Sequence, residues 1–311
     1  MAKTTTAKPA KKPAAKATAK PAAKAAAKPA AKAAAKPAAK PAAKAAAKPA
    51  RAAAPAKAAA PAKASAKAAA KPAAKAKPAK KPDLTLSVIK PSVNNLAVRV
   101  FVRAAKLNFE EADAYGQTRS KAFLGKNPAH LTPMIEEKGL PRGTLWESCA
   151  IMQYLSNKHG LDRFYPKAPA KRAMVDSAMF YLIGTFYPYL ARATYPALNF
   201  PQYPGEVGAS EADDASKQAA QKAAAAALAE PLEVFRSFYI ADKPFIGGTQ
   251  PSIADIRLAA TLEFLAAIDY ALPKWARDYV AAMEKKLGKA YTEPAGDVRG
   301  YIAWVKSQKA A

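Results

Sequence analysis

The first 82 residues contain no acidic residue, no glycine and none of the large apolar residues Val, Ile, Leu, Phe, Trp and Tyr. A segment without large apolar side chains cannot bury enough surface to form a core. It consists mainly of Ala, Pro and Lys, and its 22 Lys and Arg residues carry most of the chain's formal net charge of +27. We therefore expect a disordered basic segment over residues 1–82, followed by a folded region.

Cysteine and histidine are also scarce. The chain has one cysteine, Cys149, and two histidines, so an intrachain disulfide is impossible and the ligands are too few for a structural zinc site. No apolar run approaches the roughly 18 residues of a membrane-spanning helix. These absences predict a soluble cytoplasmic protein. Association of this protein with a nucleoid or a nucleus is a further prediction. A mitochondrial transit peptide is the alternative, because such peptides are basic and poor in acids.

The basic segment indicates a negatively charged partner. Its Lys/Ala/Pro repeats resemble the tails of linker histones and bacterial histone-like proteins. Lysines bind nucleic acids by releasing counterions, and a segment with no aromatic residue and one arginine, Arg51, has little with which to read bases. We expect non-specific nucleic-acid binding. The alternatives are a solubilising or spacing tail, or another polyanion such as an acidic protein or an anionic membrane surface.

After Pro82 the sequence predicts two folded parts. Strand patterns occur at residues 84–89, 107–112, 132–135 and 143–146, with helices starting near Asn95 and at Glu147. Strand signals almost disappear after residue 168, and the remaining apolar faces have helical spacing. These helical segments are residues 174–190, 215–239, 252–268, 275–287 and 298–306. The predicted organisation is an α/β domain over residues 83–162, a linker over 163–170 and an all-helical domain over 171–311.

Four motifs, in this order, resemble those of the cytosolic glutathione S-transferases. They are Pro91-Ser92-Val93-Asn94, Asn127-Pro128 before Thr132-Pro133, Leu145-Trp-Glu-Ser-Cys-Ala-Ile151, and Phe245-Ile-Gly-Gly before Ser252-Ile-Ala-Asp-Ile256. The resemblance spans residues 83–311 and implies a thioredoxin-like domain followed by an all-α domain, in a homodimer. It implies conjugation of the co-substrate glutathione to small electrophiles, as in detoxification, or glutathione-dependent reduction, with no metal. The alternative is a non-catalytic, transferase-like dimerisation module that carries a polyanion-binding tail.

The resemblance assigns roles to five residues. Ser92 is implied as the catalytic hydroxyl, which keeps the glutathione sulfur anionic at a helix N-terminus; an ordinary N-cap is the alternative. Thr132 is implied to present main-chain groups to the cysteinyl part of glutathione, beside a cis bond to Pro133. Glu147 and Ser148 are implied to hold the ammonium and carboxylate of the γ-glutamyl group, and an ordinary helix start is the alternative.

Three further residues have open interpretations. His130 is predicted to lie near the glycyl carboxylate, with a solvated loop histidine as the alternative. Asn94 is grouped with the glutathione-binding residues, although proline is common at this place in the family. Cys149 is more typical of a small buried apolar residue than of a reactive thiol.

Other positions depart from the family pattern or fit two interpretations. Thr132 stands where Val or Ile is usual, and Leu131 where a Lys or Gln often contacts glutathione. With Asn94, these departures point to weakened glutathione binding. The aromatic residues between positions 180 and 189 either line the pocket for the electrophile or belong to the core.

Overall fold

The computed structural model describes residues 81–200 and 213–310, and these residues belong to one compact unit. The predictions for the basic segment therefore concern residues outside the described ranges, apart from Lys81 and Pro82. The description below concerns the two described ranges alone.

The first part of the unit is built on a four-stranded sheet with strand order β2-β1-β3-β4. Strand β1 (Leu84–Val88) pairs in parallel with β2 (Phe109–Asp113) and antiparallel with β3 (Met134–Glu136), and β3 pairs antiparallel with β4 (Thr144–Trp146). All four strands were expected from their apolar patterns, and no boundary is shifted by more than two residues. This mixed sheet confirms the predicted thioredoxin-like fold.

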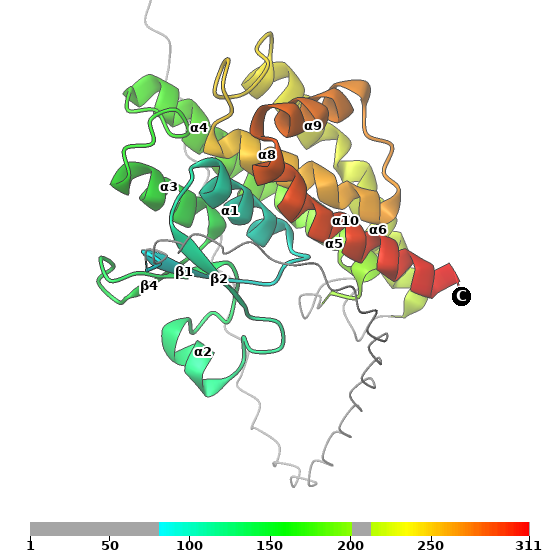
Figure 1. Ribbon diagram of the computed structural model, residues 1–311. Helices are drawn as coiled ribbons and strands as arrows, with labels where there is room; N and C mark the ends of the chain where they lie inside the picture. The colour runs from blue at the N-terminus through cyan, green and yellow to red at the C-terminus, as the bar shows by residue number, and fades with distance from the viewer. Residues whose placement is uncertain (1–80, 201–212, 311) are drawn as a thin grey trace, which may run out of the picture. The chain divides into compact units, whose positions relative to one another are not determined.

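Three helices accompany the sheet: α1 (Val93–Ala104), α2 (Lys121–Lys126) and α3 (Ser148–Lys158). Helix α1 begins two residues before the predicted position. It contacts α3, and also α8 and α10 of the helical part described next (Figure 1). Because α1 has neighbours on several sides, nine of its residues are buried, among them the polar Asn95 and the charged Arg99.

The described residues of the second part form helices, as predicted, with one isolated β-bridge between Phe245 and Gly248, but the expected long helices are interrupted. Its elements are α4 (Pro169–Tyr181), η1 (Leu182–Phe186), α5 (Tyr187–Thr194), η2 (Pro196–Leu198), α6 (Asp214–Ala227), α7 (Ala229–Val234), η3 (Phe235–Ile240), α8 (Ile253–Phe264), η4 (Leu265–Ile268), α9 (Lys274–Leu287) and α10 (Lys289–Ala310). Elements η1 and η3 are π-helical, a wider turn that apolar spacing does not reveal. In the described ranges, no helix combines the length and the apolarity needed to cross a membrane.

Helix α8 forms the centre of the helical part. All of its 12 residues are buried, and it contacts α1, α3, α4, α5, α9 and α10. The predicted capping box is confirmed at its start, where the backbone N–H of Ser252 donates to Asp255 over 2.7 Å. Asp255 also accepts from the backbone N–H groups of Ile246 and Gly247. These bonds attach the preceding loop to the buried end of α8.

Candidate functional site

The strand register places the three predicted site segments at one end of the sheet. Ser87 of β1 pairs with Met134 of β3, which pairs in turn with Trp146 of β4. Because β3 runs antiparallel to both neighbours, the chain beyond β1, before β3 and beyond β4 lies at the same sheet end. These stretches contain Ser92 after β1, Thr132 and Pro133 before β3, and Glu147 and Ser148 after β4.

Ser92 lies at the N-cap position of α1, half-buried and with extended backbone angles (φ −109°, ψ 136°). Its carbonyl accepts the first helical bond, from Leu96 at 2.8 Å. Its side chain, however, accepts no capping bond from the helix. Within the described residues no hydrogen bond of this hydroxyl is found, so it can donate to a ligand at the positive end of the helix dipole.

Thr132 precedes the buried Pro133, and the peptide bond between them is cis, as predicted. The hydroxyl of Thr132 accepts a 3.0 Å bond from the side-chain amide of Asn95 on α1. This bond uses the Thr132 hydroxyl as an acceptor, and the hydroxyl keeps its own hydrogen for donation. The Asn95 bond also ties this loop to the helix that begins at Ser92.

The loop before Thr132 is organised by the buried side chain of Asn127. Its amide donates to the carbonyl of Leu131 at 2.8 Å, and its Oδ1 accepts from the N–H of Ala129 at 3.0 Å. His130 lies inside this loop with a positive φ of 49° and is half-buried. Within the described ranges no hydrogen bond of its imidazole is found, and Leu131 is half-exposed.

Glu147 and Ser148 stand at the start of α3. Glu147 is the exposed N-cap residue and has φ 75° and ψ 113°, a region that residues other than glycine rarely adopt. Its side chain makes no capping bond. Ser148 is the first residue of the helix and is buried. Strained backbone of this kind is concentrated at ligand sites, and the unbonded N–H groups of a helix N-terminus favour an anion.

Asn94 is committed to contacts within the protein. Its Nδ2 donates to the hydroxyl of Tyr187 on α5 at 3.0 Å, and its Oδ1 accepts from Arg257 on α8 at 2.5 Å. Tyr187 in turn shares a 2.5 Å bond with Tyr195. Asn94 therefore joins the start of α1 to the helical part of the molecule. Tyr187, from the aromatic segment, lies beside this connection, and only part of it is exposed.

Cys149 is buried beside Ser148, in agreement with its interpretation as a small core residue. Burial is the main cause that raises the pKa of its thiol, and Arg257 opposes that rise. The raised pKa leaves little thiolate at neutral pH. Cys149 therefore offers no good nucleophile of its own to the site.

Asn95 and Arg257 are residues of this region that the sequence analysis did not single out. Asn95 looked like a helix-start residue, and nothing in its neighbours indicated its bond to a loop 37 residues away. Arg257 carried a usable signal. It is the one basic residue in the mainly apolar stretch of residues 253–262, whose other polar residues are Asp255 and Thr261, so a helix buried on all sides must also bury its charge.

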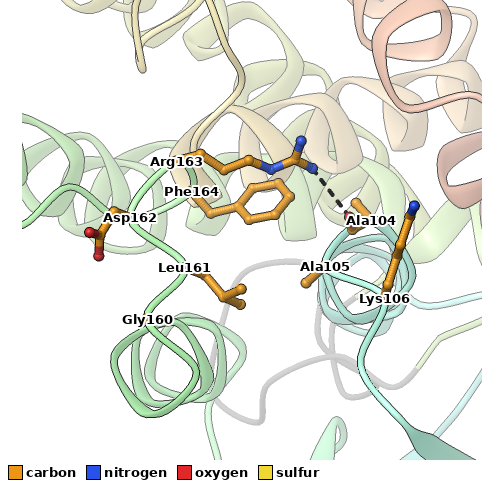
Figure 2. Close-up of a pocket in the computed structure, with 8 residues that line it drawn as sticks. All are labelled: Ala104, Ala105, Lys106, Gly160, Leu161, Asp162, Arg163 and Phe164. Carbon is orange, nitrogen blue, oxygen red and sulfur yellow. Dashed lines mark hydrogen bonds between the residues drawn. The ribbon is translucent and has the colours of Figure 1, made fainter.

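A separate pocket of about 430 Å³ lies near the C-terminal end of α1, lined by Ala104 and Lys106 on one side and by Leu161, Arg163 and Phe164 on the other (Figure 2). Arg163 crosses to donate to the carbonyl of Ala104 at 3.2 Å. A 12-residue helix is about 18 Å long, so this pocket is remote from Ser92. It is not part of the candidate site.

The arrangement fits a small peptide thiol. It presents an uncommitted hydroxyl at a helix N-terminus, main-chain groups beside a cis-proline, and a second helix N-terminus with a strained glutamate. Within the two described ranges, no three His, Cys, Asp or Glu side chains gather closely enough to hold a metal ion. The hydroxyl, the main-chain groups and the helix N-termini at this sheet end can form hydrogen bonds to an anionic ligand.

Solved structures of glutathione transferases resemble this chain. An epsilon-class enzyme from the housefly, Musca domestica, is 26% identical, with a TM-score of 0.57 and coverage of 72% of this chain and 98% of its own. A Bombyx mori glutathione transferase is 25% identical, with a TM-score of 0.56 and coverage of 73% and 97%. Human glutathione transferase theta-2, solved in complex with glutathione and an unknown ligand, is 21% identical, with a TM-score of 0.60 and coverage of 72% and 91%.

Two family models match the chain itself. The model for the N-terminal domain of glutathione S-transferase matches residues 51–157, and the model for the C-terminal domain matches residues 218–284. Together they span more than half of the sequence and correspond to the sheet-containing part and the helical part. The chain therefore belongs to the glutathione S-transferase family.

Proposed function

We propose that the protein is an active glutathione transferase in which Ser92 activates the thiol. The observation that carries this proposal is the uncommitted hydroxyl of Ser92 at the start of α1, at the same sheet end as the Thr132 loop and the start of α3. Ser148 and Glu147 bind the γ-glutamyl group, the main chain of Thr132 binds the cysteinyl part, and His130 lies near the glycyl carboxylate.

The reaction requires glutathione to react as its thiolate. An ordinary thiol has a pKa of about 8.5, and a hydroxyl donor with a helix N-terminus stabilises the anion. The thiol proton leaves to solvent, the Ser92 hydroxyl donates to the sulfur, and the sulfur attacks an electrophilic carbon. A carbon–sulfur bond forms as the leaving group departs with the electron pair of the bond that breaks.

A comparison of two serines at helix starts tests this role. Ser120 at the start of α2 accepts a genuine capping bond from Phe123, whereas Ser92 makes none. Ser92→Ala should lower kcat for conjugation by about a hundredfold with little loss of thermal stability. Ser120→Ala should cost about 1 kcal/mol of stability and retain activity. Equal rates in the Ser92→Ala variant and the unmodified protein would remove Ser92 from the mechanism.

A non-catalytic scaffold is the competing function, and the engagement of Asn94 and the apolar Leu131 favour it. Glutathione binding separates the two, because a ligand of the folded state raises stability by RT ln(1 + [L]/Kd). The proposed enzyme should show a rise in Tm at millimolar glutathione. An unchanged Tm would leave the scaffold as the better account.

We propose further that the basic segment of residues 1–82 holds the protein on nucleic acid. The support is its 22 positive charges without a single acid. For binding to duplex DNA, log K should fall by about 0.9 per unit of log salt concentration for each phosphate neutralised. Binding should be equal for unrelated sequences of the same length. It should vanish in a protein of residues 83–311. Binding retained by that shorter protein would assign the site to the folded part.

We also propose that the protein acts as a homodimer. Exposed apolar residues on α4, Met174 and Phe180, support an association surface on the helical part. Light scattering of the full chain should give twice the mass of one chain, and Phe180→Asp should shift it towards one chain. A single-chain mass for the unmodified protein at micromolar concentration would contradict this proposal.

A further inference from the structure

Arg257 carries a buried positive charge without an acidic partner. Its side chain is fully buried in the centre of α8. In the described ranges, no carboxylate lies within ion-pair distance of its guanidinium, whereas Arg99, the other buried arginine there, pairs with Glu111 and Asp297. A buried cation is costly unless a counter-charge compensates it, so Arg257 requires an explanation that Arg99 does not.

The hydrogen bonds of Arg257 satisfy its guanidinium only in part. One terminal nitrogen donates to the Oγ1 of Thr261 at 3.0 Å and the other to the Oδ1 of Asn94 at 2.5 Å. The ring of Tyr187 faces the guanidinium, with 5.4 Å from its centre to the Cζ. The Nε is buried and has no hydrogen-bond partner among the residues that the structure describes. All these partners are neutral, so the positive charge remains uncompensated.

Arg257 also determines which way the Asn94 amide points. A guanidinium has only donors, so the oxygen of Asn94 must face Arg257 and its Nδ2 must face the hydroxyl of Tyr187. The charge is thus held against the first turn of α1, two residues after Ser92. The charge of Arg257 also lowers the pKa of the thiol of Cys149, the neighbour of Ser148 on α3, whereas the charge of Glu147 raises that pKa.

We propose that Arg257 is a positioning residue whose fixed positive charge lies beneath the glutathione site. In the described ranges no carboxylate pairs with this charge, and bound anionic glutathione is its counter-charge. The inference rests on the proposed function, because it assumes that glutathione binds at Ser92 and Ser148. Arg257 acts through the protein interior and through Asn94, and it does not touch the substrate.

The size of the expected effect follows from the separation. Asn94 and Ser92 are two residues apart, so the guanidinium lies on the order of 10 Å from the place where the thiolate forms. At an effective dielectric constant of about 20, a unit charge at that distance shifts a pKa by about one unit. Removing the charge should raise the thiol pKa of bound glutathione by that amount.

The test compares variants of the full chain that separate charge from hydrogen bonding. Arg257→Gln keeps a donor for Asn94 and removes the charge, whereas Arg257→Lys keeps the charge. Arg99→Lys on α1 is the control for a buried arginine that has carboxylate partners. The thiol pKa of bound glutathione is read from thiolate absorbance against pH, and Kd values are measured for glutathione and for S-methylglutathione, which has no ionisable thiol.

The proposal expects Arg257→Gln to raise the bound thiol pKa by about one unit and to weaken binding of glutathione at pH 8 more than binding of S-methylglutathione. Arg257→Lys should keep the bound thiol pKa close to that of the unmodified protein, and Arg99→Lys should not change the thiol pKa. If the Arg257 variants do not fold, Asn94→Asp provides the test, because it keeps Arg257 and places a carboxylate against it. It should raise the thiol pKa without loss of thermal stability.

Two failures can be told apart. If the unmodified protein does not bind glutathione, the proposed function fails and this inference fails with it. If the unmodified protein binds glutathione and the thiol pKa is unchanged in Arg257→Gln or in Asn94→Asp, the inference alone is overturned. An equal rise in Arg99→Lys would also overturn it, because the effect would then be one of packing.

Discussion

Asn95 and Thr132 connect the first helix to the loop before the cis-proline through a 3.0 Å bond from the Nδ2 of Asn95 to the Oγ1 of Thr132. Asn95 is fully buried, and its Oδ1 has no partner in the described part of the chain. The bond to Thr132 is therefore the side-chain hydrogen bond that holds this buried amide, and it sets the distance between two segments of the candidate site.

Thr132→Val should lower the free energy of unfolding by about 1–3 kcal/mol, because it keeps the side-chain shape but leaves a buried amide donor unpaired. Chemical denaturation measures the loss. The control is Thr144→Val, whose hydroxyl donates to the carbonyl of Lys126 in an exposed bond of 2.8 Å. That control should cost less than about 0.5 kcal/mol, and equal losses in the two variants would contradict the importance of the Asn95 bond.

Asp255→Ala should prevent folding or lower the free energy of unfolding by at least about 3 kcal/mol, because it leaves several buried donors without an acceptor. These include the N–H and hydroxyl of Ser252 and the hydroxyl of Tyr279. The matched control is Asp278→Ala on α9, which loses only an exposed pair with Lys274 and should cost about 0.5 kcal/mol or less. Thermal unfolding distinguishes them; similar Tm values would exclude a central role for the capping box.

Glu111 should make the protein sensitive to acid. Burial alone would raise the pKa of this carboxyl, but hydrogen bonds and positive charge from Arg99 and Arg103 bring it below its ordinary value of 4.5. As the pH falls below 4.5, the unfolded chain takes up the proton first. The stability contributed by Glu111 is therefore complete above that pH and is lost as the pH falls through the folded-state pKa.

The measurement for Glu111 is the free energy of unfolding against pH. Glu111→Gln should be less stable at pH 7 and should show a shallower decline between pH 4.5 and the folded-state pKa. Glu110→Gln, at the exposed neighbouring position, should keep the slope of the unmodified protein. A slope unchanged by Glu111→Gln would show that the arginine pair does not control acid stability.

Cys149 should resist alkylation in the folded protein. Burial raises the pKa of its thiol, so less thiolate is present at any given pH, and access to it is restricted. Iodoacetamide at pH 8 should modify it at least about tenfold faster in denaturant than in the folded state, as followed by mass spectrometry. Rapid stoichiometric modification of the folded protein would contradict its assignment to the core.

Much of the fold was predictable because local patterns and tertiary structure agree. The alternating residues of β1 and the apolar spacing of α8 gave their elements directly, and the Ser252 and Asp255 pair marked where α8 begins. The start of α1 was placed too late, at Asn95, because Val93 and Asn94 resemble turn residues. The π-helical segments escaped prediction because apolar residues on both sides continue the 3.6-residue spacing.

The candidate site was predictable from its motifs but not in its connections. Ser92, Thr132 and Ser148 were each marked by short patterns, and the strand register places them at one sheet end. The bonds of Asn94 to Tyr187 and Arg257 join residues 93 and 163 positions apart. Local spacing carries no information on such pairs, so the bond between Arg257 and Asn94 was visible only in the folded structure.

Helix α1 carries Ser92 and packs against both α3 and the pair α8 and α10. If the chain were cut in the connection before α4, each half would expose an apolar surface that the other now covers. Neither half is then a self-sufficient unit. Any evolutionary exchange of the helical portion would have to preserve the surface that meets this helix.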